Sequence, residues 1–209
     1  TETAPWRTFE KVFNSQKPLQ PGDTLVLLDG TYTEGTTGLP RIDCTTNANN
    51  GTAGNVITLK AKNERRAHLQ GSGEQPFFLT NCNYWTVEGI YASNVDNAAT
   101  GSSSGHVFSV SNGRNITLRR LLAVHPNRTC LLESNPECNA HAINIDLSTY
   151  VLIEECEAYD FHRIGIVLFS SSDSVVRRSY AGLPVIAGAG ISTYCSSRNV
   201  VENSFSEEA

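Results

Sequence analysis

A repeat in five copies constrains the fold of this chain more than any other feature. Residues 77–92 read FFLTNCNYWTVEGIYA, and later segments align with them from residues 108, 143, 166 and 191. In the alignment, apolar residues share columns at alternate positions: Phe77, Phe108, Ile143, Ile166 and Ile191, then Leu79, Val110, Ile145, Leu168 and Thr193. A period of two is typical of strands with one buried face. Stacked strand repeats of this kind predict an all-β fold, a parallel β-solenoid with one continuous core.

The sequence before the repeats divides into two parts. Residues 1–22 place four apolar side chains on one face of a helix that ends before Pro18: Trp6, Phe9, Val12 and Phe13. We expect this segment to cap the apolar end of the solenoid. Residues 23–76 read as irregular first coils, and residues 77–209 as five stacked coils. The chain is therefore predicted to form a single β-helix domain over residues 1–209.

Charged residues alternate in sign in one column of the repeat. The column contains Glu88, Arg119, Glu154, Arg177 and Glu202, and Lys60 is expected to extend it before Glu88. Equivalent residues on neighbouring coils lie about 4.8 Å apart, so this alternation predicts a ladder of ion pairs between coils. A basic patch for a polyanion is the competing interpretation, but the glutamates cancel most of the field of the arginines. We therefore interpret the ladder as structural.

Composition indicates an extracellular protein that binds neither nucleic acid nor membrane. Lys and Arg total 16 against 21 Asp and Glu, giving a net charge of −5, and nucleic-acid-binding domains are usually basic. No apolar run approaches the roughly 20 residues of a membrane-spanning helix. The sequence begins at Thr1 and contains no Met, as expected of a processed, secreted chain.

Cysteines and glycosylation sequons agree with this compartment. The short loop between Cys130 and Cys138 predicts one disulfide, and a second is predicted between Cys44 and Cys82. Cys156 and Cys195 lie two coils apart in different columns, so we expect them to be buried thiols. Three Asn-X-Ser/Thr sequons predict glycans at Asn50, Asn115 and Asn127.

The first half of the chain resembles a known family. The segments LQPGDTLVLLDGTYTEG, GTAGNVITLKA and FFLTNCNYWTVEGIYASN resemble, in this order, the opening of right-handed parallel β-helix proteins of the pectate-lyase-like superfamily, and within it the alginate lyase and chondroitinase B family. The resemblance implies a polysaccharide substrate, a lysine base and an arginine acid on later coils, and calcium as a cofactor. The last lysine of this sequence is Lys62, before those coils. The residues themselves predict no cofactor and no metal site, because His106 and His141 lack a third ligand.

Long insertions follow Ala92 and Ala123 at the same turn of successive coils, so they should lie on one edge of the solenoid. Four polar residues at this turn are the predicted catalytic residues, able to hold a carboxylated sugar and move a proton: His125, Asp160, His162 and Arg163. The competing interpretation is that they only bond the loops. Tyr91, Tyr159 and Tyr180 are the predicted substrate-binding residues.

The last coil stops at NSFSEEA with its apolar columns open. Exposed strand edges are normally covered, so we expect either further coils beyond Ala209 or another subunit. Two functions follow. The first is a secreted β-helix that binds or processes an extracellular polysaccharide, as a lyase or glycoside hydrolase if it is an enzyme. The alternative is a structural protein whose copies stack end to end into an extracellular fibre, sheath or spike.

Overall fold

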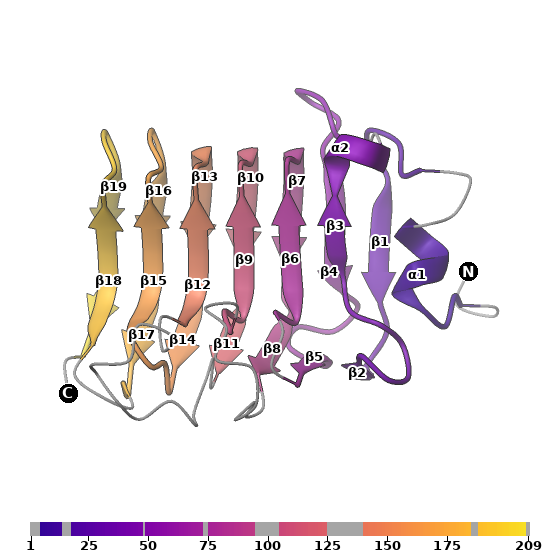
Figure 1. Cartoon of the computed structure of the whole chain (residues 1–209), viewed down its shortest axis with the longest axis horizontal. Helices are drawn as coiled ribbons and strands as arrows, with labels where there is room; N and C mark the ends of the chain where they lie inside the picture. The colour runs from indigo at the N-terminus through magenta and orange to yellow at the C-terminus, as the bar shows by residue number, and fades with distance from the viewer. Residues whose placement is uncertain are drawn as a thin grey trace.

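The computed structural model describes residues 5–13, 18–47, 49–72, 75–94, 105–124, 140–184 and 188–207, which form a parallel β-helix (Figure 1). Three sheets of parallel strands run along its axis. Sheet A contains β1 (Thr24–Leu27), β4 (Ile57–Ala61), β7 (Asn83–Glu88), β10 (Arg114–Arg119), β13 (Thr149–Glu154), β16 (Val175–Arg177) and β19 (Val200–Glu202).

Sheets B and C complete each coil. Sheet B contains β2 (Gly30–Thr33), β5 (Ala67–Gly71), β8 (Tyr91–Asn94), β11 (Leu122–Val124), β14 (Glu157–Tyr159), β17 (Tyr180–Gly182) and β20 (Phe205–Ser206). Sheet C contains β3 (Arg41–Asp43), β6 (Phe77–Thr80), β9 (Phe108–Ser111), β12 (His141–Asp146), β15 (Ile164–Phe169) and β18 (Ala189–Tyr194). The chain passes from C to A to B and then returns to C.

The register of the strands confirms the sequence columns. Phe77 pairs with Phe108, which pairs with Ile143 in the next coil, and Ala92 pairs with Ala123 in sheet B. The inward side chains of these columns are fully buried in the middle coils. Burial of apolar surface in a stack shared by all coils is what holds the solenoid together.

Short turns join sheet C to sheet A and sheet A to sheet B. Residues in the left-handed region recur in both, for example Asn81 (φ 56°) and Asn112 (φ 51°) in the first turn, and Gly89 (φ 67°) in the second. Asparagine and glycine tolerate this conformation. The Asn112 side-chain amide also donates to Oδ1 of Asn81 at 2.7 Å, which ties one coil to the next.

The helix α1 (Phe9–Phe13) lies beside β1 at the N-terminal end of the stack (Figure 1). It buries Phe9, Val12 and Phe13, and the Phe9 ring lies 5.6 Å from the ring of Tyr32. The prediction for Trp6 is wrong, because its side chain is 62% exposed. The helix begins only at Phe9, so Trp6 precedes its first turn and does not share its apolar stripe.

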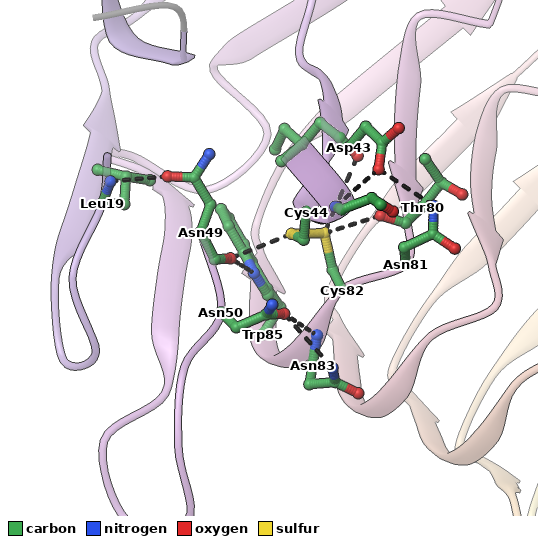
Figure 2. Close-up of a disulfide and its surroundings, with 12 residues drawn as sticks. Leu19, Asp43, Cys44, Asn49, Asn50, Thr80, Asn81, Cys82, Asn83 and Trp85 are labelled. Carbon is green, nitrogen blue, oxygen red and sulfur yellow. Dashed lines mark hydrogen bonds between the residues drawn. A yellow bond between two sulfur atoms is a disulfide. The ribbon is translucent and has the colours of Figure 1, made fainter. Parts of the chain in front are cut away.

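The predicted disulfide between Cys44 and Cys82 is confirmed (Figure 2). It joins the short helix α2 (Cys44–Asn47) to the turn after β6. Next to it, the Asn49 carbonyl accepts a hydrogen bond from the Trp85 indole at 2.7 Å, and Oδ1 of Asn49 accepts one from the Leu19 amide at 2.7 Å. The bridge therefore belongs to a buried junction that joins the first two coils.

The other cysteine predictions have different outcomes. Cys130 and Cys138 lie outside the described residues. Cys156 is a buried thiol, and desolvation raises its pKa to about 12. The prediction for Cys195 is wrong, because this thiol is exposed. It occupies a left-handed turn position (φ 50°) on the last coil, where no further described coil covers it.

The charged column lies on the outer face of sheet A, and the strand register places Lys60, Glu88, Arg119, Glu154, Arg177 and Glu202 side by side in that order. Glu154 is the centre of the ion pairs, 3.1 Å from Nε of Arg119 and 2.7 Å from Nη2 of Arg177. Glu88 instead pairs with Arg120, which comes from the neighbouring turn. The contacts thus extend over the strand and the turn that follows it.

Candidate functional site

The three predicted substrate-binding tyrosines lie on the outer face of sheet B, which we call the tyrosine face: Tyr91, Tyr159 and Tyr180. Their positions alternate with the buried alanine column, so their side chains point away from the core. All three are half-buried. Tyr91 and Tyr180 share one column, three coils apart, and Tyr159 lies in the adjacent column.

Contacts within sheet B hold these rings in place. The rings of Tyr159 and Tyr180 are 5.3 Å apart. Tyr180 lies over Gly182, where a β-carbon would come within 2.1 Å of the phenol oxygen. At the other end of the face, the Tyr91 ring stacks on His68 at 4.0 Å, with the planes inclined by 8°. Each of the three rings is thus held by a neighbour within sheet B.

The charge beside Tyr159 is balanced. Its hydroxyl donates to Oε2 of Glu157 at 2.9 Å, and Oε1 of Glu157 pairs with Arg65 at 2.7 Å. Desolvation and the neighbouring carboxylate raise the pKa of Tyr159 to about 12. The phenol is therefore neutral at physiological pH, and the ring presents no negative charge to a ligand.

Three of the four predicted catalytic residues lie where strands of sheet B end and strands of sheet C begin. Asp160 directly follows β14 in a left-handed conformation (φ 54°) and is half-buried, whereas Arg163 is exposed. His162 is only 2% exposed, so it cannot touch a ligand in this conformation. His125 lies outside the described residues. The structure thus places Asp160, His162 and Arg163 on one turn next to Tyr159.

Two further histidines lie at this edge. The rings of His106 and His141 stack at 5.0 Å, and the His141 amide donates to Nδ1 of His106 at 2.9 Å. Desolvation lowers the pKa of His106 to about 4, and desolvation with the charges of His106 and Arg163 lowers that of His141 to about 3. Both rings are neutral at physiological pH and are too weakly basic to be efficient general bases there.

The described residues contain no group of three or more His, Cys, Asp or Glu side chains that could hold a metal ion. Calcium also binds backbone and amide oxygens, so the calcium that the resemblance implies stays a prediction. Of the predicted glycosylation sites, Asn115 is the second residue of β10, half-buried and in a left-handed conformation (φ 57°). Oδ1 of Asn50 accepts a hydrogen bond from the Asn83 amide at 2.7 Å, and Asn127 lies outside the described residues. Neither described helix is long and apolar enough to span a membrane.

Some residues next to the tyrosine face were not predicted from the sequence. His68 and Arg65 precede the first aligned repeat, which starts at Phe77, so no column included them. Glu157 carried a usable signal, because residues two apart on a strand face the same side. It therefore had to lie beside Tyr159.

Neither a protein-family model nor a curated protein matches this chain. Three solved structures share its fold. A rhamnogalacturonan lyase matches 97% of this chain and 59% of its own length (TM-score 0.60, 13% identity). A structure described as a glycosyl hydrolase from Parabacteroides merdae matches 88% of this chain and 81% of its own length (TM-score 0.59, 10% identity).

A pectate lyase matches 89% of this chain and 50% of its own length (TM-score 0.55, 18% identity). The chain thus spans 59% of the rhamnogalacturonan lyase and half of the pectate lyase. At such identities the likeness establishes the fold alone. It confirms what the resemblance to the pectate-lyase-like superfamily implies: this chain is a right-handed parallel β-helix.

Proposed function

We propose that this protein binds an extracellular polysaccharide along the tyrosine face and the adjoining edge between sheets B and C. The tyrosine face is the observation that carries the proposal. Sugar rings expose apolar C–H groups that pack on aromatic rings, while their hydroxyls bond to polar groups at the ring edge. The rings of Tyr159 and Tyr180 are in contact, and Tyr91 lies three coils from Tyr180. Rings spaced along the helix axis in this way suit a ligand that is itself a chain of repeating sugar units.

The geometry supports a ligand that lies along the helix axis. Tyr91 and Tyr180 are separated by three coil spacings, or about 14 Å at about 4.8 Å per coil. Tyr159 lies between them and next to Asp160, and Arg163 is exposed on the same turn. A guanidinium group binds carboxylates well, so Arg163 favours an acidic sugar at this edge.

The shared fold supports the same class of ligand. Lyases for pectate and rhamnogalacturonan and a glycosyl hydrolase have this fold, and the analogy is at the level of fold only. The Cys44–Cys82 disulfide favours an oxidising, extracellular location. Binding is better supported than bond cleavage in the described part of the edge, because His162 is buried and His106 and His141 are weak bases. Asp160, His162, Arg163 and His125 stay the predicted catalytic residues.

A structural role is the second candidate. On the last coil, Val201 and Phe205 belong to columns that are buried or half-buried elsewhere, yet both are exposed. An exposed edge of this kind suits the stacking of another copy of the chain on the last coil. Copies stacking head to tail would, however, have to displace α1 from the first coil. This contact argues against an open fibre and favours the polysaccharide proposal.

Electrophoresis of the protein through gels that contain pectate, alginate, rhamnogalacturonan or a neutral glucan tests the proposal. We expect at least one polysaccharide to retard the native protein. Tyr159→Ala and Tyr91→Ala should each weaken retardation by about fivefold to tenfold, since loss of an aromatic contact costs on the order of 1 kcal/mol.

Trp6→Ala is the matched control, because it removes an exposed aromatic ring from outside sheet B. It should leave retardation unchanged. Retardation that all three variants retain would rule out the tyrosine face as the binding surface. Incubation of the same polysaccharides with the protein, followed by assays for unsaturated sugars and for reducing ends, tests for lyase and hydrolase activity.

A further inference from the structure

A second surface with features of a ligand site lies on the outer face of sheet C. In each coil the last outward residue of the strand falls in one column, which contains Asp43, Thr80, Ser111, Asp146, Phe169 and Tyr194. Phe169 and Tyr194 are 39% and 58% exposed, and their rings stack at 5.3 Å with a plane angle of 19°. Two adjacent coils thus present a continuous aromatic surface.

Asp146 borders this surface. It pairs in register with Ser111 on one side and Phe169 on the other. Its side chain is half-buried, and Oδ1 is buried with no hydrogen-bond partner in the described part of the chain. Burial raises the pKa of the carboxyl group. The Leu147 backbone amide hydrogen-bonds the carboxyl group as well, and because the side chain is only half-buried the group stays open to a ligand hydroxyl.

The turn after β12 adds exposed apolar surface. Leu147 is exposed in a left-handed conformation (φ 49°), which is unfavourable for leucine. Tyr150, the second residue of β13, is also exposed and left-handed (φ 56°), with the Arg114 guanidinium 5.1 Å from its ring centre. Contiguous exposed apolar groups rimmed by polar ones mark binding surfaces.

We propose that Asp146, Phe169 and Tyr194 form a binding site for a neutral sugar unit. The apolar face of the sugar packs on the stacked rings, and its hydroxyls donate to the Asp146 carboxylate. The outer column carries a single charge from Thr80 to Tyr194, and that charge is negative. A uronate would be repelled by Asp146, so the site selects against acidic sugars.

This site is independent of the tyrosine face. It lies on sheet C, next to the turn that leads to sheet A, whereas the tyrosines lie on sheet B. The two sites also differ in charge, because Arg163 is exposed beside Tyr159 and Asp146 lies beside Phe169. A branched or mixed polysaccharide would supply both kinds of sugar.

Isothermal titration calorimetry on the full chain tests this site, with cellohexaose, mannohexaose and hexagalacturonate as probes. We expect one of the neutral hexasaccharides to bind. Asp146→Ala and the double variant F169A/Y194A should each weaken that binding by about tenfold or more, as expected for loss of a charged hydrogen bond or of two ring contacts. Thr80→Ala, in the same column two coils away, should leave it unchanged.

Thermal unfolding of the same variants separates a ligand-binding role from a structural one. Asp146→Ala should unfold at about the same temperature as the native protein, because the side chain is half-buried and one of its two oxygens is buried without a partner. A lower unfolding temperature would make Asp146 structural, and F169A/Y194A would then decide the question alone. Failure of both neutral probes to bind at millimolar concentration, or binding that F169A/Y194A leaves intact, overturns the proposal. Tyr159→Ala changes only the tyrosine face and should retain binding of the neutral hexasaccharide. The proposal for sheet C and the proposal for the tyrosine face can therefore fail independently.

Discussion

Single residues at the edge between sheets B and C make stability depend on pH. His141 is buried against His106, and its pKa is lowered to about 3 from an ordinary value of 6.5. As pH falls below 6.5 the unfolded chain takes up a proton at this residue, whereas the folded chain does not. Stability is therefore lost as pH falls from about 6.5 towards the folded pKa.

We expect His141→Gln to flatten this dependence. Between pH 6.5 and pH 5 the native protein should lose on the order of 1 to 2 kcal/mol of unfolding free energy through His141. Urea unfolding at several pH values measures the slope, and the variant should lose less over the same range. His68→Gln, which removes a half-buried histidine from sheet B, serves as comparison. Equal slopes for native protein and His141→Gln would contradict the assignment.

At the scale of a strand, Glu154 organises the end of β13. Its side chain is 6% exposed and contacts Arg119, Arg177 and Arg178. Glu154→Gln should lower the unfolding free energy on the order of 1 to 3 kcal/mol, because three cations lose their shared anion while staying partly solvated. Glu202→Gln changes the same column on the exposed last coil and should cost less. Chemical denaturation of both variants compares them, and a larger loss for Glu202→Gln would refute this reading.

Sequence periodicity predicted the strands and their register because equivalent residues of successive coils must stack. The alanine column of sheet B and the Phe77 column of sheet C are examples. Burial at turns was beyond its reach. His162 and Cys195 both occupy turn positions, yet His162 is buried and Cys195 is exposed. The burial of a turn residue depends on the neighbouring coils and loops, which the period of the strands does not describe. Phe169 and Tyr194 fell outside the predicted site because they point outward, where the period of the buried apolar columns carries no information.

At the scale of the whole molecule, α1 closes the apolar end of the first coil. Phe9 and Phe13 are buried there. Phe9→Asp combined with Phe13→Asp should expose that end and cause concentration-dependent self-association, because an open solenoid end presents both apolar core and strand edges. Light scattering across a concentration series measures it. Glu10→Ala, an exposed change in the same helix, should scatter like the native protein, and a double variant that stays as dispersed as the native protein would show that α1 is not a cap.

From Phe77 onwards, the three junctions of a coil differ in how much their lengths vary. Phe77 and Trp85 are eight residues apart, and so are Phe108 and Ile116 and also Ile143 and Val151. In contrast, successive coils repeat after 31, 35, 23 and 25 residues (77 to 108, 143, 166 and 191), with all of the difference between sheets B and C. Segments grafted at this one junction would leave the stacking of the core untouched. The molecule is thus built as a scaffold with interchangeable loops, on which binding specificity can diversify without refolding the helix.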